Sequence, residues 1–356
     1  MSVPRFFSPV EAQAGAGLRE GFIKCSLCPR RCVLPPGEGG QCRVRVNRDG
    51  KPALPFYGFV TALALDPIEK KPLYHFRPGT EILSAGFAGC NLHCPFCQNW
   101  HISQKADVPG RFYSPAELAA AAAKNAGAGS GAGNALVQSI AYTYSEPLVH
   151  IEFLLDCMKE ARKSGAANVL VSNGCINPEA AEEVLALTDA ANIDLKCFSK
   201  ETYKKVLGGD LSTVLSFIRR AAEKGVHLEL TTLVVPGLND GEEELDQCRD
   251  FIAELETGSI AVPWHLSAYH PDYKWHAPPT DPRFLSAAAG RAREKLLFVY
   301  TGNVAGEKND TPCPHCGKTL IRRRGYSVDT SGLALKDDNG KPAYFCNHCG
   351  ARAPIA

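Results

Sequence analysis

Three cysteines lie within eight residues in the segment CNLHCPFCQNW, at Cys90, Cys94 and Cys97, with the aromatic Phe96 directly before the last. Thiolates at such short spacings are typical ligands of iron–sulfur clusters. Disulfides pair cysteines in twos and a closed zinc site takes four ligands, so three thiolates leave a metal centre with one open position. We therefore expect a 4Fe–4S cluster whose fourth iron is free for a non-protein ligand.

Two other interpretations of this triplet stay open from its spacing alone. A zinc ion could take the three thiolates together with a more distant ligand, for which His93 and His101 are candidates. Cys94 and Cys97 also form a CxxC pair, the pattern of a redox-active dithiol. The spacing and the nearby Gly89, where the backbone can come close without a β-carbon, favour a loop wrapped around a cluster.

Eight further cysteines form two groups of four, one on each side of the triplet. Four thiolates close a metal site, so we expect zinc or a second 4Fe–4S cluster at the first group. A second cluster would be able to relay electrons, whereas zinc would be structural. The second group consists of two CxxC pairs, as in a zinc ribbon, with a rubredoxin-like iron as the alternative. The groups are Cys25, Cys28, Cys32 and Cys42, then Cys313, Cys316, Cys346 and Cys349.

The overall composition narrows the class of protein. Lysine and arginine number 39 against 38 aspartates and glutamates, so no global field favours nucleic acid or an anionic membrane. No apolar stretch approaches the ~20 residues of a membrane span. The N-terminal sequence lacks the pattern of a signal peptide, and fifteen cysteines in a chain of 356 residues are typical of metal ligands in a reducing compartment. We expect a cytoplasmic protein.

Seven short apolar and β-branched runs between residues 80 and 303 predict the strands that must position these cysteines. Helical patterns separate the runs, which indicates a parallel sheet of βα units that is buried on both faces. A chain with about six βα units is expected to form a full or partial barrel. In such barrels, the catalytic residues lie where the carboxyl ends of the strands meet the loops. The runs are TEILSAGF, ALVQSIAYT, NVLVSNG, ANIDLKC, VHLELTTLVV, WHLSAYH and KLLFVYTG.

Helix starts and domain boundaries follow from local signals. Three segments combine an N-cap residue with proline at the first helical position, and a glycine-rich loop at residues 127–134 follows the alanine-rich helix. We expect three units: a cysteine-rich lobe at residues 1–75, a barrel at 76–304 and a knuckle at 305–356. The helix starts are Ser114–Pro115–Ala116–Glu117, Asn177–Pro178 and Asp281–Pro282.

The triplet resembles the signature of the radical S-adenosylmethionine (SAM) enzymes, CxxxCxφC with an aromatic residue at φ. Cys90, Cys94, Phe96 and Cys97 match it in full. The later segments YTYSEP, VSNG, IDLK, VVPGLND and LSAYHP resemble, in the same order, strand ends of pyruvate formate-lyase activating enzyme. The likeness spans most of residues 80–303. It implies a partial (β/α)6 TIM-like barrel of the radical SAM type, here flanked by small cysteine-rich metal lobes.

This resemblance implies a set of SAM-binding residues. SAM carries an ammonium, to which Glu146 and Asp194 would offer carboxylates, and a carboxylate, to which Lys196 and Ser172 would offer a cation and a hydroxyl. The apolar ring of Phe96 would face adenine. Ser145 and Glu146 stand where related enzymes carry Gly-Gly-Glu. The full set is Phe96, Ser145, Glu146, Ser172, Asn173, Asp194, Lys196 and His270.

The implied activity is that of an oxidoreductase in which a reduced cluster cleaves SAM to methionine and a 5′-deoxyadenosyl radical, which abstracts hydrogen from a substrate. The N-terminal cysteines, the segment DPIEKKPLYHFRPGT and the triplet together resemble the AmmeMemoRadiSam-system subgroup. That likeness implies partners of the Memo and AMMECR families, besides an electron donor. The substrate is open, with a glycyl residue of a partner enzyme, another protein side chain or a small molecule as candidates.

Two classes of protein compete with a radical enzyme. An iron–sulfur electron carrier would use several metal centres without a substrate, but it leaves the missing fourth cysteine of the triplet unexplained. A nucleic-acid-binding zinc-ribbon protein conflicts with the near-neutral charge and with the lack of an aromatic–basic stripe. Tyr142, Tyr144 and His265 are further candidates for side chains inside the barrel.

Overall fold

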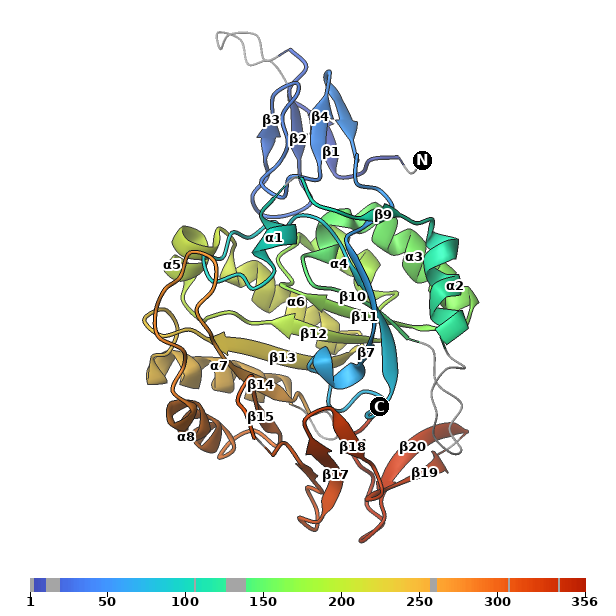
Figure 1. The fold of residues 1–356 in the computed structure, drawn as a ribbon, viewed down its shortest axis with the longest axis vertical. Helices are drawn as coiled ribbons and strands as arrows, with labels where there is room; N and C mark the ends of the chain where they lie inside the picture. The colour runs from blue at the N-terminus through green and yellow to red at the C-terminus, as the bar shows by residue number, and fades with distance from the viewer. Residues whose placement is uncertain are drawn as a thin grey trace.

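A single sheet of eight strands forms the centre of the molecule, in the order β15-β14-β13-β12-β11-β10-β8-β7 (Figure 1). Strand β7 (Ala62–Pro67) pairs antiparallel with β8, and the other seven strands run parallel. The sheet is open, because β15 and β7 lie at opposite edges. The computed structural model describes residues 3–10, 20–105, 107–125, 139–256, 261–306, 308–338 and 340–356.

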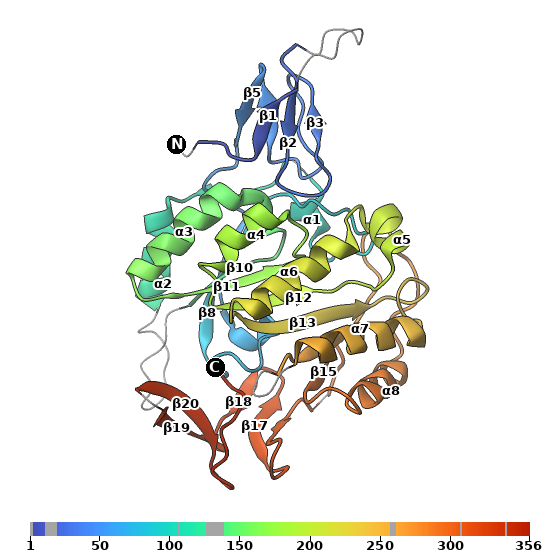
Figure 2. The ribbon, with the colours of Figure 1, turned by 180° about the vertical axis from the view of Figure 1, so that it is seen from behind.

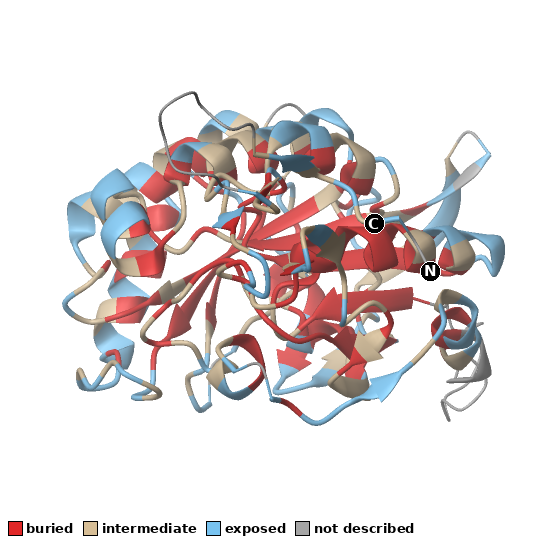
Figure 3. Ribbon diagram, turned by 90° about the horizontal axis from the view of Figure 1, so that it is seen from above, coloured by how far each residue is buried: buried red, intermediate tan, exposed pale blue. Residues whose placement is uncertain are grey.

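All seven apolar runs predicted as strands are strands of this sheet. Most of their residues are buried, as expected for strands covered on both faces (Figure 3). The predicted partial α/β barrel is therefore confirmed. The seven strands are β8 (Glu81–Gly86), β10 (Ser139–Thr143), β11 (Ala167–Ser172), β12 (Ala190–Asp194), β13 (His227–Val234), β14 (Trp264–Ala268) and β15 (Val299–Gly302).

Six longer helices cover the outer face of the sheet, which Figure 2 shows from the helical side. No helix in the described part of the chain is long and apolar enough to cross a membrane. The long helices are α2 (Pro115–Asn125), α3 (Ile151–Lys163), α4 (Pro178–Leu185), α6 (Leu211–Glu223), α7 (Glu242–Leu255) and α8 (Pro282–Ala292). The short helices are η1 (Ile68–Lys70), α1 (Trp100–Ser103), η2 (Pro147–His150), α5 (Lys200–Thr202) and η3 (Tyr203–Leu207).

The predicted helix starts are confirmed, although one cap uses its side chain differently. Ser114 and Glu117 form a reciprocal capping box at α2, with the Ser114 amide donating to the Glu117 carboxylate at 2.7 Å. Asp281 accepts from the amide of Arg283 at α8. At α4, Asn177 does not cap with its side chain and instead donates to the carbonyl of Ser26 in the N-terminal lobe, 2.7 Å away. The predicted glycine-rich loop at 127–134 lies outside the described residues.

A buried carboxylate organises the end of the barrel where the strands begin. Glu229, fully buried on β13, accepts hydrogen bonds from the amides of Tyr74 and His75 at 2.9 and 2.7 Å. His265 Nε2 lies 2.7 Å and His227 Nε2 3.1 Å from the same carboxylate. His265 is thus a satisfied core histidine rather than a free group in the barrel. This end is filled, which leaves the opposite end for chemistry.

The N-terminal lobe packs on the carboxyl end of the barrel through a buried ion pair. Arg45 Nη1 lies 2.7 Å from Glu152 of α3, with both side chains almost fully buried. Strand β7 falls within the segment expected to form this lobe, yet it belongs to the central sheet. The lobe contains β1 (Phe7–Pro9), β2 (Ile23–Cys25), β3 (Val33–Leu34), β4 (Val46–Arg48) and β5 (Lys51–Ala53), and β6 (Phe59–Val60) pairs with β9 (Arg111–Phe112).

The C-terminal lobe covers the filled end of the barrel, at the opposite end of the molecule (Figure 1). Arg323 donates to the carbonyl of Tyr74 at 2.6 Å, and the His75 ring lies 2.9 Å from the carbonyl of Pro354. The amide of Ala356 donates to the carbonyl of His75 at 2.7 Å. The lobe is built from β16 (Thr311–Pro312), β17 (Thr319–Arg324), β18 (Ser327–Asp329), β19 (Leu333–Asp338) and β20 (Lys341–Cys346).

The buried histidine at this junction predicts acid lability. Burial lowers the pKa of His75 to about 3, while an exposed histidine titrates near 6.5. As the pH falls below 6.5, the unfolded chain takes up a proton that the folded chain cannot take up until about pH 3. The free energy of unfolding should therefore drop by up to about 1.4 kcal/mol per pH unit from this residue. Urea unfolding between pH 7 and 4 measures that slope.

His75→Gln removes the titration and should make the slope shallower by this amount, whatever it costs at pH 7. The same change at the exposed His276 is the control and should leave the slope as in the wild type. An unchanged slope in His75→Gln would contradict the assignment of acid lability to this junction.

Candidate active site

The carboxyl ends of four parallel strands meet at one cleft beneath the N-terminal lobe. The cysteine loop follows β8, Glu146 follows β10, Asn173 follows β11, and Asp194 ends β12. The cleft has a volume of about 330 Å³. This lies at the lower end of the roughly 300–1,000 Å³ that small-molecule sites typically take.

All three cysteines of the triplet line this cleft. Cys90 is flanked by two donors, the amide of Leu92 at 3.3 Å and the side-chain amide of Asn173 at 3.6 Å from its sulfur. Cys97 lies 3.2 Å from the hydroxyl of Ser103. Such donors stabilise negative charge on sulfur and tune a bound cluster.

Neither histidine considered as a fourth ligand lines the cleft. His93 lies 2.8 Å from the guanidinium of Arg30, and His101 is an exposed residue of α1 next to Trp100. The zinc alternative therefore has no histidine in place to complete it. Three thiols without a fourth protein ligand suit a cluster that keeps one iron open.

Burial makes two of these thiols, Cys90 and Cys94, poor thiolates unless a metal is bound. It raises the pKa of Cys94 to about 12 and that of Cys90 well above its usual range. A coordinating metal removes such protons outright. The donors around Cys90 would then face a charged sulfur. The residues present thus fit an iron–sulfur cluster held by Cys90, Cys94 and Cys97.

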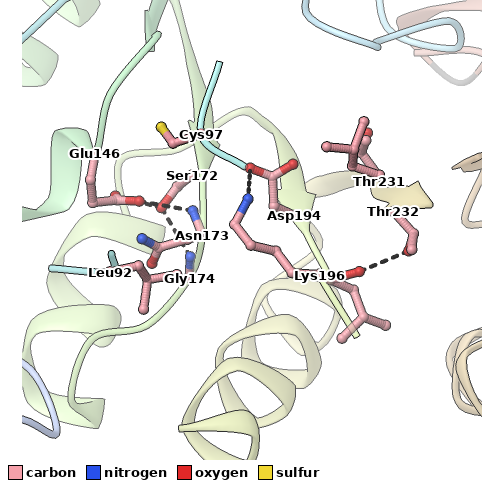
Figure 4. A network of polar contacts seen from close by, with 12 residues as sticks. Leu92, Cys97, Glu146, Ser172, Asn173, Gly174, Asp194, Lys196, Thr231 and Thr232 are labelled. Atoms are coloured by element: carbon pink, nitrogen blue, oxygen red, sulfur yellow. Dashed lines mark hydrogen bonds and ion pairs between the residues drawn. The ribbon is translucent and has the colours of Figure 1, made fainter. Parts of the chain in front are cut away.

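A buried carboxylate lies next to the triplet. Glu146 accepts from the amide of Leu148 at 3.0 Å, the hydroxyl of Ser172 at 2.7 Å and the amide of Asn173 at 2.9 Å (Figure 4). Burial nevertheless raises the pKa of Glu146 to about 7, against the effect of these donors. A cationic ligand bound beside this carboxyl group would favour its ionised form.

An ion pair faces this carboxylate across the cleft. Lys196 Nζ lies 3.1 Å from Asp194 Oδ2, and both residues line the cleft (Figure 4). Burial alone would lower the pKa of Lys196, but the charge of Asp194 raises it overall, so the ammonium stays charged. The cleft therefore offers anionic groups and a cation to a ligand that carries both charges.

The remaining predicted ligand-binding residues differ in whether they line the cleft. Phe96 is buried and lines the cleft, and Ser145 lines it with its hydroxyl donating to the carbonyl of Phe87 at 2.7 Å. His270 is exposed and is not itself a lining residue, but it lies 3.1 Å from the carbonyl of Asn303, which lines the cleft. Its role in ligand binding stays a prediction.

Sequence reasoning misplaced Tyr142 as a side chain inside the barrel. Its ring is fully buried in the layer between sheet and helices, and its hydroxyl donates to Asn168 at 3.1 Å. The neighbouring Ala141 packs on the inner cluster of apolar residues instead. Successive residues of a strand point to opposite faces of the sheet, so Tyr142 faces the helices while its neighbour Ala141 faces the inside of the barrel.

Sequence reasoning also missed a charged group at the edge of the cleft. Lys71 is buried, lines the cleft and lies 2.7 Å from Asp66, while its ammonium sits 4.3 Å from the centre of the Tyr144 ring. Tyr144 has a left-handed backbone (φ 68°) and donates to Asp66 at 2.5 Å. A β-carbon at Gly86 would lie 2.8 Å from the Tyr144 ring, so this arrangement requires glycine there.

The C-terminal cysteines form a compact site. The four sulfurs of Cys313, Cys316, Cys346 and Cys349 lie within 4.8 Å of one another. The two pairs Cys313–Cys349 and Cys316–Cys346 are 3.7 and 3.8 Å apart. A tetrahedral ion with metal–sulfur bonds of about 2.3 Å separates its thiolates by about 3.8 Å. The predicted cluster of four cysteines is confirmed, and its sulfurs are close enough together to hold a single metal ion.

Comparison with known sequences identifies the family. The radical SAM superfamily profile matches residues 86–248, which include the triplet, Glu146, Asp194 and Lys196. The chain is 37% identical over 350 residues to the uncharacterized protein MJ0808 of Methanocaldococcus jannaschii, covering 97% of this chain and 99% of that one. The chain belongs to the radical SAM superfamily. It is an enzyme of this type, with a 4Fe–4S cluster and SAM as the implied cofactors.

Two relatives with a named activity are more distant. Pyruvate formate-lyase 1-activating enzyme of Escherichia coli is 23% identical over 209 residues, which cover 56% of this chain and 79% of that enzyme. A probable GTP 3′,8-cyclase of Methanococcus vannielii is 28% identical over 268 residues, covering 70% and 83%. The predicted likeness to activating enzymes is confirmed. The names of these two relatives describe enzymes with different substrates.

The pair formed by Asp66 and Lys71 should stabilise the fold as well as shape the cleft. Asp66→Asn leaves a buried ammonium unpaired, and we expect a loss of about 3–5 kcal/mol in the free energy of unfolding. The double variant Asp66→Asn/Lys71→Met removes both charges and should recover most of that loss. Urea unfolding of the wild type, both single variants and the double variant measures the coupling. Additive losses in the double variant would contradict a direct pair.

Proposed function

We propose that this enzyme binds SAM in the cleft, with the methionine end between Glu146 and Lys196 and next to the cysteine triplet. The arrangement of these charges carries the proposal. Glu146 would accept the ammonium, and Lys196 would bind the carboxylate. Ser172 and Asn173 hold Glu146 in place through bonds of 2.7 and 2.9 Å. Phe96 would cover the adenine with its buried ring.

Cys90, Cys94 and Cys97 would hold a 4Fe–4S cluster, and that cluster would supply the electron for reductive cleavage of SAM bound in the cleft. The chain's own residues orient the sulfonium and keep water away from the radical. Buried apolar residues of the loop, Leu92 and Phe96, and the N-terminal lobe above the cleft support this exclusion of water. The substrate that would give up a hydrogen atom to this chemistry would bind on the side of Lys71 and Tyr144, which also line the cleft.

The relatives and this second side of the cleft support a proposal for the substrate class. The relatives with activating-enzyme names favour a residue of a partner protein, in the simplest case a glycyl residue. The extra N-terminal cysteines precede the triplet, unlike the usual arrangement of activating enzymes with added clusters. We therefore favour a protein side chain or small molecule with an anionic group that Lys71 can attract, and keep the glycyl residue as the alternative.

We also propose membership of the AmmeMemoRadiSam-system subgroup, with Memo and AMMECR family proteins as partners. The N-terminal cysteines and the segment DPIEKKPLYHFRPGT support it, because Asp66 and Lys71 of that segment line or support the cleft. A low-potential electron donor is a further partner. All fifteen cysteines are free thiols, which supports a reducing compartment such as the cytoplasm.

The proposed metal of the C-terminal site is zinc. Sulfur separations of 3.7 and 3.8 Å suit a tetrahedral ion, and the lobe contributes no residue to the cleft, so its role is structural. At the N-terminal four cysteines, zinc and a second cluster are both compatible with the residue types.

Formation of 5′-deoxyadenosine tests the proposed reaction. The reconstituted enzyme, incubated anaerobically with SAM and dithionite, should release 5′-deoxyadenosine, whereas Cys94→Ala should release none because its central cluster lacks a ligand. Liquid chromatography with mass detection measures the nucleoside. Cys248→Ala, which removes a buried core cysteine of α7, is the matched control and should retain the activity. No nucleoside from a wild type that holds its central cluster would overturn the proposal.

Protonation of Glu146 should control SAM affinity. With a pKa of about 7 in the free site, its carboxylate must lose a proton before it pairs with an ammonium, so the Kd for SAM should fall as the pH rises from 6 to 8. The limiting slope is about tenfold per pH unit below the pKa. Equilibrium dialysis of the oxidised, reconstituted enzyme measures this profile.

Glu146→Gln should bind SAM more weakly at pH 8 and show a flat profile. Glu182→Gln, the same change on the outer surface of α4, should behave as the wild type. A pH-dependent Kd in Glu146→Gln would show that another group binds the ammonium.

A further inference from the structure

The four N-terminal cysteines line one enclosed cavity between the lobe and the barrel. Its walls also include the apolar side chains of Leu27, from the lobe, and Val149, from η2 of the barrel. The four cysteines that line it are Cys25, Cys28, Cys32 and Cys42. Gly40 forms part of the wall, and a β-carbon there would lie 3.7 and 3.8 Å from the sulfurs of Cys42 and Cys32. The four thiols therefore surround a common space.

These four sulfurs are spaced more widely than those of the C-terminal site. In the described part of the chain, the C-terminal cysteines alone bring four sulfurs within 4.8 Å of one another. A single tetrahedral ion demands sulfur separations of about 3.8 Å. A cube of irons and sulfides is wider than one ion, so thiolates on its corners stand further apart. The wider spacing favours a 4Fe–4S cluster over zinc.

A buried cation at the cavity also favours a charged centre. Arg45 is 1% exposed and lines the cavity. Its Nη1 and Nη2 bind Glu152 at 2.7 and 3.0 Å, while its Nε has no hydrogen-bond partner among the described residues. A buried donor without a partner is costly. An anionic cluster with sulfur acceptors would supply the missing partner.

The wall of this cavity is also the start of the central cysteine loop. Asn91 lines the cavity, and its neighbour Cys90 lines the active-site cleft. A β-carbon at Gly89 would lie 2.2 Å from the carbonyl oxygen of Cys42, so the backbones that carry Cys42 and Cys90 are in direct contact there. Arg30 adds a bond of 3.1 Å from its Nε to the carbonyl of Asn91. Residues 89–91 therefore form part of the wall between the two cysteine sites.

We infer that the N-terminal cysteines hold a second 4Fe–4S cluster, which passes electrons to the central cluster through the wall formed by residues 89–91. A low-potential one-electron donor reduces the N-terminal cluster. That cluster is then oxidised by one electron as the central cluster is reduced by one, and no proton or bond is exchanged. The use of the electron at SAM rests on the proposed function, but the presence and the coupling of the two clusters do not.

The metal content of a central-site variant tests the first part. Cys90→Ala/Cys94→Ala/Cys97→Ala, reconstituted anaerobically with iron and sulfide, should retain one four-iron, four-sulfide cluster per chain. Mössbauer and electron paramagnetic resonance (EPR) spectra should show it after dithionite reduction. The matched change Cys28→Ser/Cys32→Ser should retain only the central cluster. Zinc in place of iron at the N-terminal site of the triple variant would overturn the inference.

The EPR spectrum of the fully reduced wild type tests the second part. Two paramagnetic clusters that share a wall should interact, so this spectrum should differ from the sum of the two variant spectra. If the N-terminal variant does not fold, power saturation gives the same information from the triple variant. The N-terminal signal should relax faster in the wild type than in that variant. A spectrum equal to the sum, with unchanged relaxation, would rule out coupling across the wall.

The outcomes separate this inference from the proposed function. Coupled clusters in a protein that does not cleave SAM would support the electron relay and contradict the proposed reaction. SAM cleavage by a protein with zinc at the N-terminal cysteines would support the proposed reaction and contradict the relay. Cys248→Ala controls for the loss of a cysteine as such and should give the spectra of the wild type.

Discussion

The structure depends on holding buried and half-buried charged groups at the carboxyl edge of a parallel sheet. Glu146, Asp194 and Lys196 lie there beside the cysteine triplet, in which burial raises the pKa of the Cys90 and Cys94 thiols. Each group is stabilised by a specific partner, as in the bonds from Ser172 and Asn173 to Glu146. Such partners are needed because an unpaired buried charge costs several kcal/mol. The same arrangement makes the cleft complementary to a zwitterionic ligand.

The two lobes pack against opposite ends of the barrel. The N-terminal lobe packs directly on the central cysteine loop, where Gly89 contacts the backbone of Cys42. Its anchor is the buried pair of Arg45 with Glu152. The C-terminal lobe instead closes the far end of the barrel through Arg323, His75 and the chain terminus. One lobe is therefore placed to take part in electron transfer, and the other to stabilise the scaffold.

The sequence predicted the features that local patterns determine. Apolar runs identified all seven parallel strands, and the capping box of Ser114 and Glu117 identified the start of α2. The cysteine triplet and the strand-end residues Glu146 and Asp194 converge as expected. These predictions succeeded because strand and helix signals act over a few residues, and because parallel strands bring their carboxyl ends to one edge.

Features that depend on contacts distant in the chain were missed. The pair of Asp66 and Lys71 becomes part of the cleft through Tyr144, which is far along the chain and donates a hydrogen bond to Asp66. The segment that forms β7 looked like part of the lobe because it pairs with the sheet only at an edge. Tyr142 was assigned to the wrong face, since the side of a strand that faces the barrel is set by tertiary packing.

The measurement that tests the account most directly is an anaerobic crystal structure of the reconstituted protein with SAM. The account predicts a 4Fe–4S cluster on Cys90, Cys94 and Cys97 alone, with the ammonium of SAM on Glu146 and its carboxylate on Lys196. A fourth protein ligand on that cluster, or SAM bound outside the cleft, would contradict the central claim that strand ends and cysteine loop form one site.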